Sequence, residues 1–184
     1  MNLSAITVSF PLDQETYEEV QNLCKTAAVC DGIHLNQIMN LTIAKNYETR
    51  GFYVLVYDDE KNLLVGAGTA VDLMGLNTYE WSMLVAPMYR QLGIGTAILN
   101  VLKEGMAIRK SEGELALVVE GSKYGKEFLQ QNGYLYSFSE ATLEAHAEVM
   151  ENKGAVTLRP FMQKDTEALI SIFSDAFGDM REES

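Results

Sequence analysis

The sequence is poor in the residues that form disulfide bonds or bind metal ions, with two cysteines and two histidines among 184 residues. Cys24 and Cys30 imply no disulfide framework, and we expect both to be ordinary reduced thiols. His34 and His146 are far apart and lie in no ligand spacing, so we expect no metal ion.

Long apolar runs are also missing. No stretch approaches the roughly 20 residues that a membrane-spanning helix needs. The first ten residues, MNLSAITVSF, lack the basic start and the cleavage site of a secretory signal. We therefore expect a cytoplasmic protein that does not bind a membrane.

Basic residues are scarce, with 14 Lys and Arg against 26 Asp and Glu, which gives a net charge of −12. This balance disfavours nucleic acid, whose binding needs clustered cations. It favours a cationic substrate or partner. The composition, 47% hydrophobic and 22% charged, is typical of a folded globular domain, and the length suits one domain with a few dozen residues over.

Apolar periodicity predicts a mixed α/β fold. We expect strands over residues 4–10, 52–57, 63–73, 78–85, 115–119 and from 134 onward. We expect helices from Asp13 to Gly32, over 36–48, from Ile94 to Ile108 and over 122–131. The order is β-α-α-β-β-β-α-β-α-β, an α/β (α+β) arrangement with a sheet that is antiparallel early and parallel late. The run at 115–119 is wholly apolar and predicts a central strand covered on both faces.

The loop after the fourth strand carries the chemical signal. Arg90-Gln91-Leu92-Gly93-Ile94-Gly95 joins a strand to a long amphipathic helix. The glycines allow a tight turn, and the free N–H groups that open the helix favour an anion such as pyrophosphate, with Arg90 adding a positive charge. A P-loop would need Gly-Lys-Ser/Thr, and a dinucleotide fingerprint would need a small residue where Ile98 stands. A plain glycine turn that only joins strand to helix remains an alternative.

This loop resembles the coenzyme A loop of the GNAT superfamily of N-acetyltransferases, Arg/Gln-x-x-Gly-x-Gly/Ala. The preceding Val85-Ala86-Pro87-Met88-Tyr89 and the later Gly133-Tyr134 are similar to other family motifs, and the resemblance covers roughly residues 4–146. It implies acetyl-CoA as co-substrate and two central strands that splay apart. The implied cofactor-binding residues are Leu84, Val85, Arg90, Gln91, Leu92, Gly93, Ile94, Gly95, Thr96 and Ser122.

The resemblance also implies a reaction, the acetylation of a primary amine of a small, cationic substrate by direct attack on the thioester. Glu80, on the fourth strand, is the candidate general base. Its alternatives are a solvated carboxylate or one that binds a cationic substrate. In many relatives a Tyr acts as the general acid for the leaving thiolate, and this chain has Leu129 at that position. A catalytically weak acyl-CoA-binding or regulatory module of a tandem-domain protein is therefore the alternative function. A dinucleotide-dependent oxidoreductase is a distant third.

The last residues restart the pattern of the first ones. Residues 156–161 read as a strand ending in Pro, and Lys164-Asp165-Thr166-Glu167 as a helix start. We divide the chain into a GNAT domain, 1–148, and a strand-helix extension, 149–184. The extension resembles the start of a second GNAT domain, as in tandem-domain proteins, or it is the seventh strand and terminal helix of one domain. As a fragment, it should dock on the first domain or on a neighbouring molecule, which allows a homodimer.

Overall fold

The computed structural model of the chain describes residues 2–32, 39–140 and 159–177. It divides into two compact units, Met1–Phe138 and Ser139–Ser184. The elements of the first unit, in chain order, are β1 (Leu3–Ser9), α1 (Gln14–Asp31), β2 (Arg50–Asp58), β3 (Leu63–Asp72), β4 (Thr78–Val85), η1 (Pro87–Tyr89), α2 (Ile94–Ile108), β5 (Gly113–Ala116) and α3 (Lys123–Gln131).

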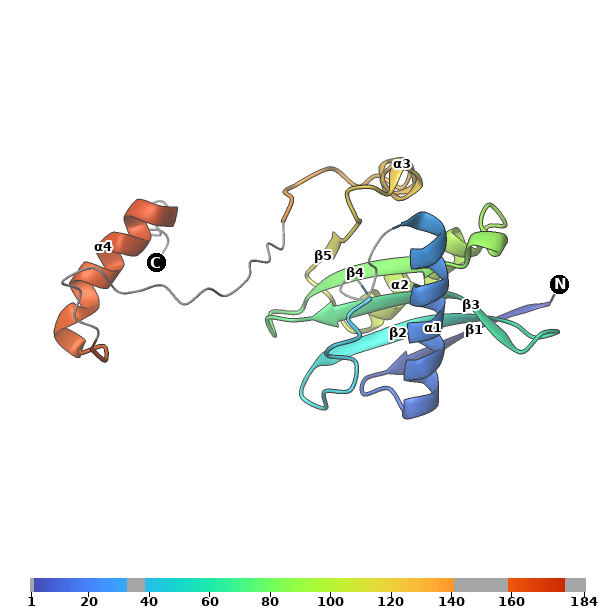
Figure 1. The fold of residues 1–184 in the computed structure, drawn as a ribbon, viewed down its shortest axis with the longest axis horizontal. Coiled ribbons are helices and arrows are strands. Elements are labelled where there is room, and N and C mark those ends of the chain that lie inside the picture. Colours follow the sequence, from blue (N-terminus) through green and yellow to red (C-terminus); the bar gives the residue numbers. More distant parts are fainter. Residues whose placement is uncertain (1, 33–38, 141–158, 178–184) are drawn as a thin grey trace, which may run out of the picture. The chain divides into compact units, whose positions relative to one another are not determined.

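The five strands form one sheet in the order β1-β2-β3-β4-β5. Neighbours from β1 to β4 pair antiparallel, and β4 pairs with β5 in parallel. Figure 1 shows α1 across one face of this sheet and α2 behind the other. The predicted mixed α/β fold is confirmed.

Helix α1 begins and ends where the sequence predicts. Asp13 is its N-cap, and its carboxylate accepts a hydrogen bond from the N–H of Thr16 at 2.9 Å. Gly32 closes the helix in the left-handed conformation with φ 67°. The apolar stripe of α1 is buried on the sheet through Val20, Leu23, Cys24 and Ala27. Burial raises the pKa of the Cys24 thiol to about 11, so this thiol is inert.

Helix α2 packs closely on the sheet because β3 carries glycines beneath it. A Cβ atom at Gly68 would lie 2.5 Å from Ile98 Cγ2 and 2.9 Å from Leu102 Cδ1. At Gly105, on α2 itself, a Cβ atom would lie 2.6 Å from the Phe52 ring. These contacts fix the depth of α2 and, with it, the position of its N-terminus.

Three sequence predictions need correction. The helix expected over 36–48 is not formed over 39–48, which make turns, while 36–38 lie outside the described residues. The strand expected at 115–119 spans Gly113–Ala116 and is the last strand of the described sheet rather than a central one, with Leu115 36% exposed. The strand expected from Tyr134 is not formed over 134–140.

The second unit contains η2 (Gln163–Asp165) and α4 (Thr166–Phe177), which confirms the helix predicted to start there. Arg159 holds Asp165 by two hydrogen bonds of 2.6 and 2.7 Å just before this helix. The predicted strand is not formed over 159–161, and the proposed boundary at 148/149 falls outside the described residues, as do His34 and His146. No helix of the described residues is long and apolar enough to cross a membrane.

Candidate active site

Strands β4 and β5 separate partway along their length. They pair from Thr78 with Gly113 to Trp81 with Ala116, and the last bond joins the Leu117 N–H to the Trp81 carbonyl at 2.8 Å. Beyond this bond a cavity of about 980 Å³ opens, lined by residues 83–85 on one side and 117–119 on the other. The predicted splay is therefore present, between β4 and the last strand of the described sheet.

The peptide groups of β4 point alternately to its two edges, so hydrogen bonds on either side identify which residues face the gap. The Trp81 carbonyl is bonded to Leu117, on the β5 side. The Ala86 N–H donates to the Val65 carbonyl at 2.8 Å, on the β3 side. Residues an even number of positions from Trp81 therefore face the cavity.

Val85 and Met83 thus present their backbone groups to the cavity, whereas those of Leu84 face β3. The sequence analysis assigned both Leu84 and Val85 to cofactor binding. Both residues line the cavity, but of the two only Val85 can offer a backbone N–H there. Met83 has the same orientation and was not singled out from the sequence.

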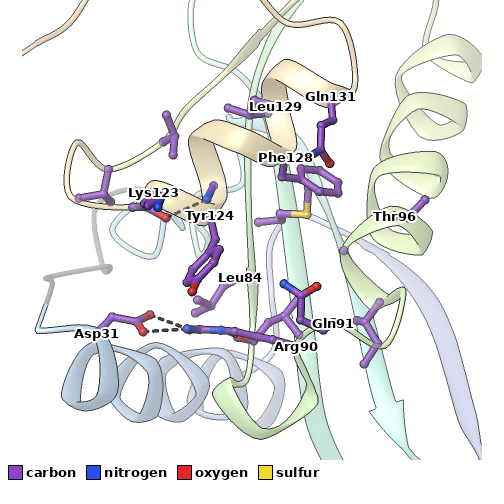
Figure 2. Close-up of a pocket in the computed structure, with 18 of the residues that line it drawn as sticks. Asp31, Leu84, Arg90, Gln91, Thr96, Lys123, Tyr124, Phe128, Leu129 and Gln131 are labelled. Atoms are coloured by element: carbon purple, nitrogen blue, oxygen red, sulfur yellow. Dashed lines mark hydrogen bonds and ion pairs between the residues drawn. The ribbon is translucent and has the colours of Figure 1, made fainter.

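The N-terminus of α2 opens into the same cavity (Figure 2). Gly93 is its N-cap with φ 81°, and no side chain caps the helix. The first intrahelical bond runs from the Ala97 N–H to the Gly93 carbonyl at 3.0 Å, so the N–H groups of Ile94, Gly95 and Thr96 have no acceptor in the helix. Gln91 has a positive φ of 63° and turns the backbone just before them. These orphan amides and the helix dipole together favour a bound anion.

The short helix η1 ahead of this loop is anchored from the β2–β3 turn. The Tyr89 hydroxyl donates to Asp58 Oδ2 and accepts from Lys61 Nζ, both at 2.7 Å. The Asp58 side chain is 1% exposed, and the hydrogen bond from Tyr89 holds the pKa of this carboxyl below its usual range, with help from Lys61. The Tyr of the Val-x-Pro-x-Tyr motif therefore has an anchoring contact in this fold.

Arg90 makes three polar contacts at the mouth of the cavity. Its Nη1 and Nη2 atoms lie 2.8 and 2.6 Å from the two carboxylate oxygens of Asp31, as the dashed lines in Figure 2 show. Its Nε donates to the Val85 carbonyl at 3.1 Å. Asp31 is the last residue of α1 and was not expected at the site. An acidic residue at a helix C-terminus was the only local signal, since the pair is separated by 59 residues.

Residues 15–134, more than half of the chain, match the family model described as the acetyltransferase (GNAT) family. The chain belongs to the GNAT acetyltransferase family. No curated protein sequence matches it closely enough to count as a relative.

Solved structures of similar fold include acetyltransferases. The aminoglycoside acetyltransferase AAC(6')-Iy, in complex with a CoA bisubstrate analogue, is 11% identical over 80% of this chain and 100% of its own, with a TM-score of 0.53. Ribosomal-protein-alanine N-acetyltransferase from Brucella melitensis biovar Abortus 2308 is 16% identical over 78% and 100%, with a TM-score of 0.53. A GNAT-family acetyltransferase from Staphylococcus aureus Mu50 is 17% identical over 72% and 84%, with a TM-score of 0.58. At these identities the likeness shows the fold, which is the GNAT fold.

Most residues predicted to bind the GNAT cofactor lie around the cavity. Those that line it are Leu84, Val85, Arg90, Gln91, Gly93, Ile94, Gly95, Thr96 and Ser122. Leu92 does not line it, and its side chain is 53% exposed. Trp81, Met83, Phe128 and Lys123 also line it and were not predicted to. Trp81 could have been predicted, because strand alternation puts it on the same face as Met83 and Val85.

Helix α3 closes the other side of the cavity and carries Leu129, where the GNAT resemblance predicted a Tyr. Ser122 is the N-cap and accepts a hydrogen bond from the Gly125 N–H at 3.2 Å. A Cβ atom at Gly125 would lie 2.7 Å from Ser122 Oγ, so a side chain at this position would clash with the N-cap. Leu129 lines the cavity. Two tyrosines lie near Leu129 in the sequence. Tyr124 lines the cavity and points across it toward the Asp31–Arg90 pair (Figure 2), whereas Tyr136 is not among the lining residues.

Glu80, the candidate base, lies on the other face of β4. It pairs with Val71 of β3, and its side chain is half-buried on the face that carries buried Ser82. It does not line the cavity. It lies on the face of β4 opposite Met83, whose sulfur would be 3.8 Å from a Cβ atom at Gly95, so base and cofactor loop are on opposite faces of the strand. Among the described residues no group of three or more His, Cys, Asp or Glu could hold a metal ion.

Proposed function

We propose that the protein is an acetyl-CoA-dependent N-acetyltransferase that acetylates a primary amine of a small, cationic substrate. One observation carries the proposal: a single cavity joins the unpaired edge of β4 to the uncapped N-terminus of α2. A long thioester with an anionic end fits both features. Pantetheine can add to the β4 edge as a strand does, and pyrophosphate can accept hydrogen bonds from the free amides.

The thioester carbonyl would lie where the Val85 N–H faces the gap. The amine nitrogen attacks this carbonyl carbon, a C–N bond forms, the C–S bond breaks, and CoA leaves as a thiolate that takes a proton from water. The Val85 N–H is the candidate donor to the oxyanion of the tetrahedral intermediate. Glu80 is the candidate base that removes the proton of the amine. Because Glu80 faces away from the cavity, the acceptor would approach from the α1 face of the sheet.

Calorimetry with acetyl-CoA tests the cofactor half of the proposal. We expect binding at micromolar concentrations, and an absence of binding at millimolar acetyl-CoA would exclude it. Two of the similar structures are complexes with CoA or a CoA-linked bisubstrate analogue, which supports the choice of ligand.

Glu80→Gln tests the catalytic half. We expect turnover to fall roughly 100-fold or more, the usual contribution of a general base, with acetyl-CoA affinity nearly unchanged. Glu104→Gln, on an exposed position of α2, is the matched control and should leave the rate unaltered. An unchanged rate in Glu80→Gln would remove Glu80 from the role of base.

The alternative is an acyl-CoA-binding module without turnover, favoured by Leu129 in the cavity at the position of the usual acid. A panel of amines assayed for release of free thiol separates the two functions. Steady release with any amine excludes the module, and tight acetyl-CoA binding without release across the panel supports it.

A further inference from the structure

The side chain of Arg90 is already occupied by protein groups. Three of the five N–H groups of a guanidinium are directed at Asp31 and at the Val85 carbonyl. The two bonds to Asp31 are parallel and short, which is the strongest geometry that Arg and a carboxylate form. Both side chains are mostly covered, 32% exposed for Arg90 and 23% for Asp31. The pair is therefore better shielded from solvent than an ordinary surface ion pair.

Asp31 has a reason to retain this partner. It is the last residue of α1, where the helix dipole is negative, and the last turn of α1 contains no basic residue. The hydrogen bonds from Arg90 hold the pKa of Asp31 below its ordinary value, against the effect of burial. If Arg90 turned toward a phosphate, the Asp31 carboxylate would be left ionised beside an anionic ligand. Repulsion between this carboxylate and the negatively charged ligand would oppose binding.

The third contact links this pair to the reaction centre. The Val85 carbonyl is on the edge of β4 that faces the cavity, the edge along which the thioester would lie. Arg90 Nε therefore fixes the peptide that follows Val85, and its forked end fixes the C-terminus of α1. One side chain ties two elements that meet at the mouth of the cavity.

We infer that the Arg90 guanidinium is a positioning residue rather than a phosphate ligand: it holds the Val85 edge of β4 and the end of α1 in place, and the backbone amides at the start of α2 meet the pyrophosphate charge. This inference rests on the proposed function, because it assigns how the same cavity takes its thioester. It predicts that loss of Arg90 weakens the binding of any acyl-pantetheine thioester, with or without phosphates.

The test compares acetyl-CoA with acetyl-pantetheine, which has the same thioester arm and no phosphate. The variant is Asp31→Asn/Arg90→Gln, in which the pair stays neutral overall, so that the long-range charge at the cavity is unaltered. Trp81 is the only tryptophan of the chain and lines the cavity, so its fluorescence reports the dissociation constant of either ligand. Circular dichroism confirms that the variant is folded.

We expect the double variant to bind both thioesters about tenfold or more weakly, and by the same factor, since the lost hydrogen bonds involve charged groups. A merely structural pair would lower the melting temperature without this equal loss of affinity. Weaker binding of acetyl-CoA alone would overturn the inference and make Arg90 a phosphate ligand, and unchanged binding of both would overturn it as well. If the wild-type protein itself binds neither thioester, the proposed function fails instead.

Arg90→Lys is the second variant and decides the question if the double variant does not fold. Lysine keeps the positive charge but has neither the fork for Asp31 nor an Nε donor for Val85. Positioning predicts an equal loss of both thioesters. A phosphate ligand predicts instead that both affinities stay near their wild-type values, because lysine keeps the charge for acetyl-CoA and acetyl-pantetheine has no phosphate to lose, and that result would contradict the inference.

Discussion

Two glycines of this chain have a positive φ angle that other residues rarely adopt, but only Gly93 lines the cavity. Gly93, at the start of α2, and Gly75, in the β3–β4 turn, have φ angles of 81° and 68°, and a Cβ atom at either would meet nothing within 4 Å. Alanine at each should cost about 1–2 kcal/mol of backbone strain. We expect Gly93→Ala to lower acetyl-CoA affinity at least about tenfold, since a methyl group there crowds the amides offered to an anion. Gly75→Ala is the control. We expect it to lose a similar amount of stability in urea unfolding and to keep the wild-type affinity in calorimetry. If both variants bound acetyl-CoA equally well, the amides at the start of α2 would not be the anion site.

The ion pair of Asp31 predicts a pH dependence of stability. Its pKa is lower in the folded protein than the ordinary value of 3.8, so the unfolded state binds the proton first. The stabilisation is present above about pH 4 and is lost as the pH falls through the folded pKa. We expect the free energy of unfolding of Asp31→Asn to fall less steeply below pH 4 than that of the wild type, measured by urea unfolding between pH 2.5 and 6. Parallel curves would show that the pair adds no stability.

At the scale of residues, the sequence predicts positions around the cavity where its signal is local. The Gly93 and Gly95 loop is six consecutive residues whose spacing alone implies a turn into a helix, and all but Leu92 line the cavity. The pairing of Asp31 with Arg90 gave no such signal, because only the packing of α1 beside the end of β4 brings their side chains together. The backbone orientation of Leu84 and Val85 also required the observed pairing of β4.

At the scale of elements, the fit of α2 against β3 depends on Gly68. A β carbon there would overlap Ile98 and Leu102, both on α2. We expect Gly68→Ala to lower the free energy of unfolding by about 1–3 kcal/mol, as overpacking does. Gly113→Ala in β5 is the control, because its Cβ atom would meet Thr78 at an ordinary 3.6 Å and should change stability by less than about 0.5 kcal/mol. Urea unfolding measures both, and equal effects would mean that α2 can shift without loss.

The elements that were predicted wrongly fail for identifiable reasons. Residues 36–48 have apolar residues at helical spacing, but Asn40 adopts a positive φ of 53°, which no right-handed helix contains. Instead, the chain makes turns here, and the side chains of Met39, Leu41 and Ala44 are buried, with exposures of 0%, 4% and 0%. In the run at 115–119, the second half, 117–119, lines the cavity where the chain separates from β4. A short apolar run does not distinguish a strand from a cavity wall.

At the scale of the whole molecule, the net charge of −12 should act on the acceptor. Attraction between this charge and a cationic amine extends over the Debye length, about 10 Å at 0.1 M salt and 3 Å at 1 M. We expect the KM of a linear polyamine to rise several-fold between 0.1 and 1 M KCl, and that of a monoamine to rise less. Steady-state thiol release at both salt concentrations measures this. Equal changes for the two amines would remove the argument for a cationic substrate.

The second unit has a helix whose apolar side chains are exposed. Helix α4 forms where the sequence predicts and exposes Leu169, Ile170 and Ile172 by 42%, 52% and 63%. Such a face is typical of a helix that packs against something else. The docking of this unit and a homodimer remain predictions, because an amphipathic pattern gives the buried face of a helix but not its partner.

The anchoring of Tyr89 by Asp58 and Lys61 has a consequence for the thermodynamics of ligand binding. These contacts are made entirely within the protein, so the turn leading into α2 is held in its shape before any ligand arrives. A ligand that meets a preorganised backbone loses little affinity to loop ordering. Acetyl-CoA binding should therefore have the modest negative heat-capacity change of surface burial alone, without the larger one that accompanies coupled folding.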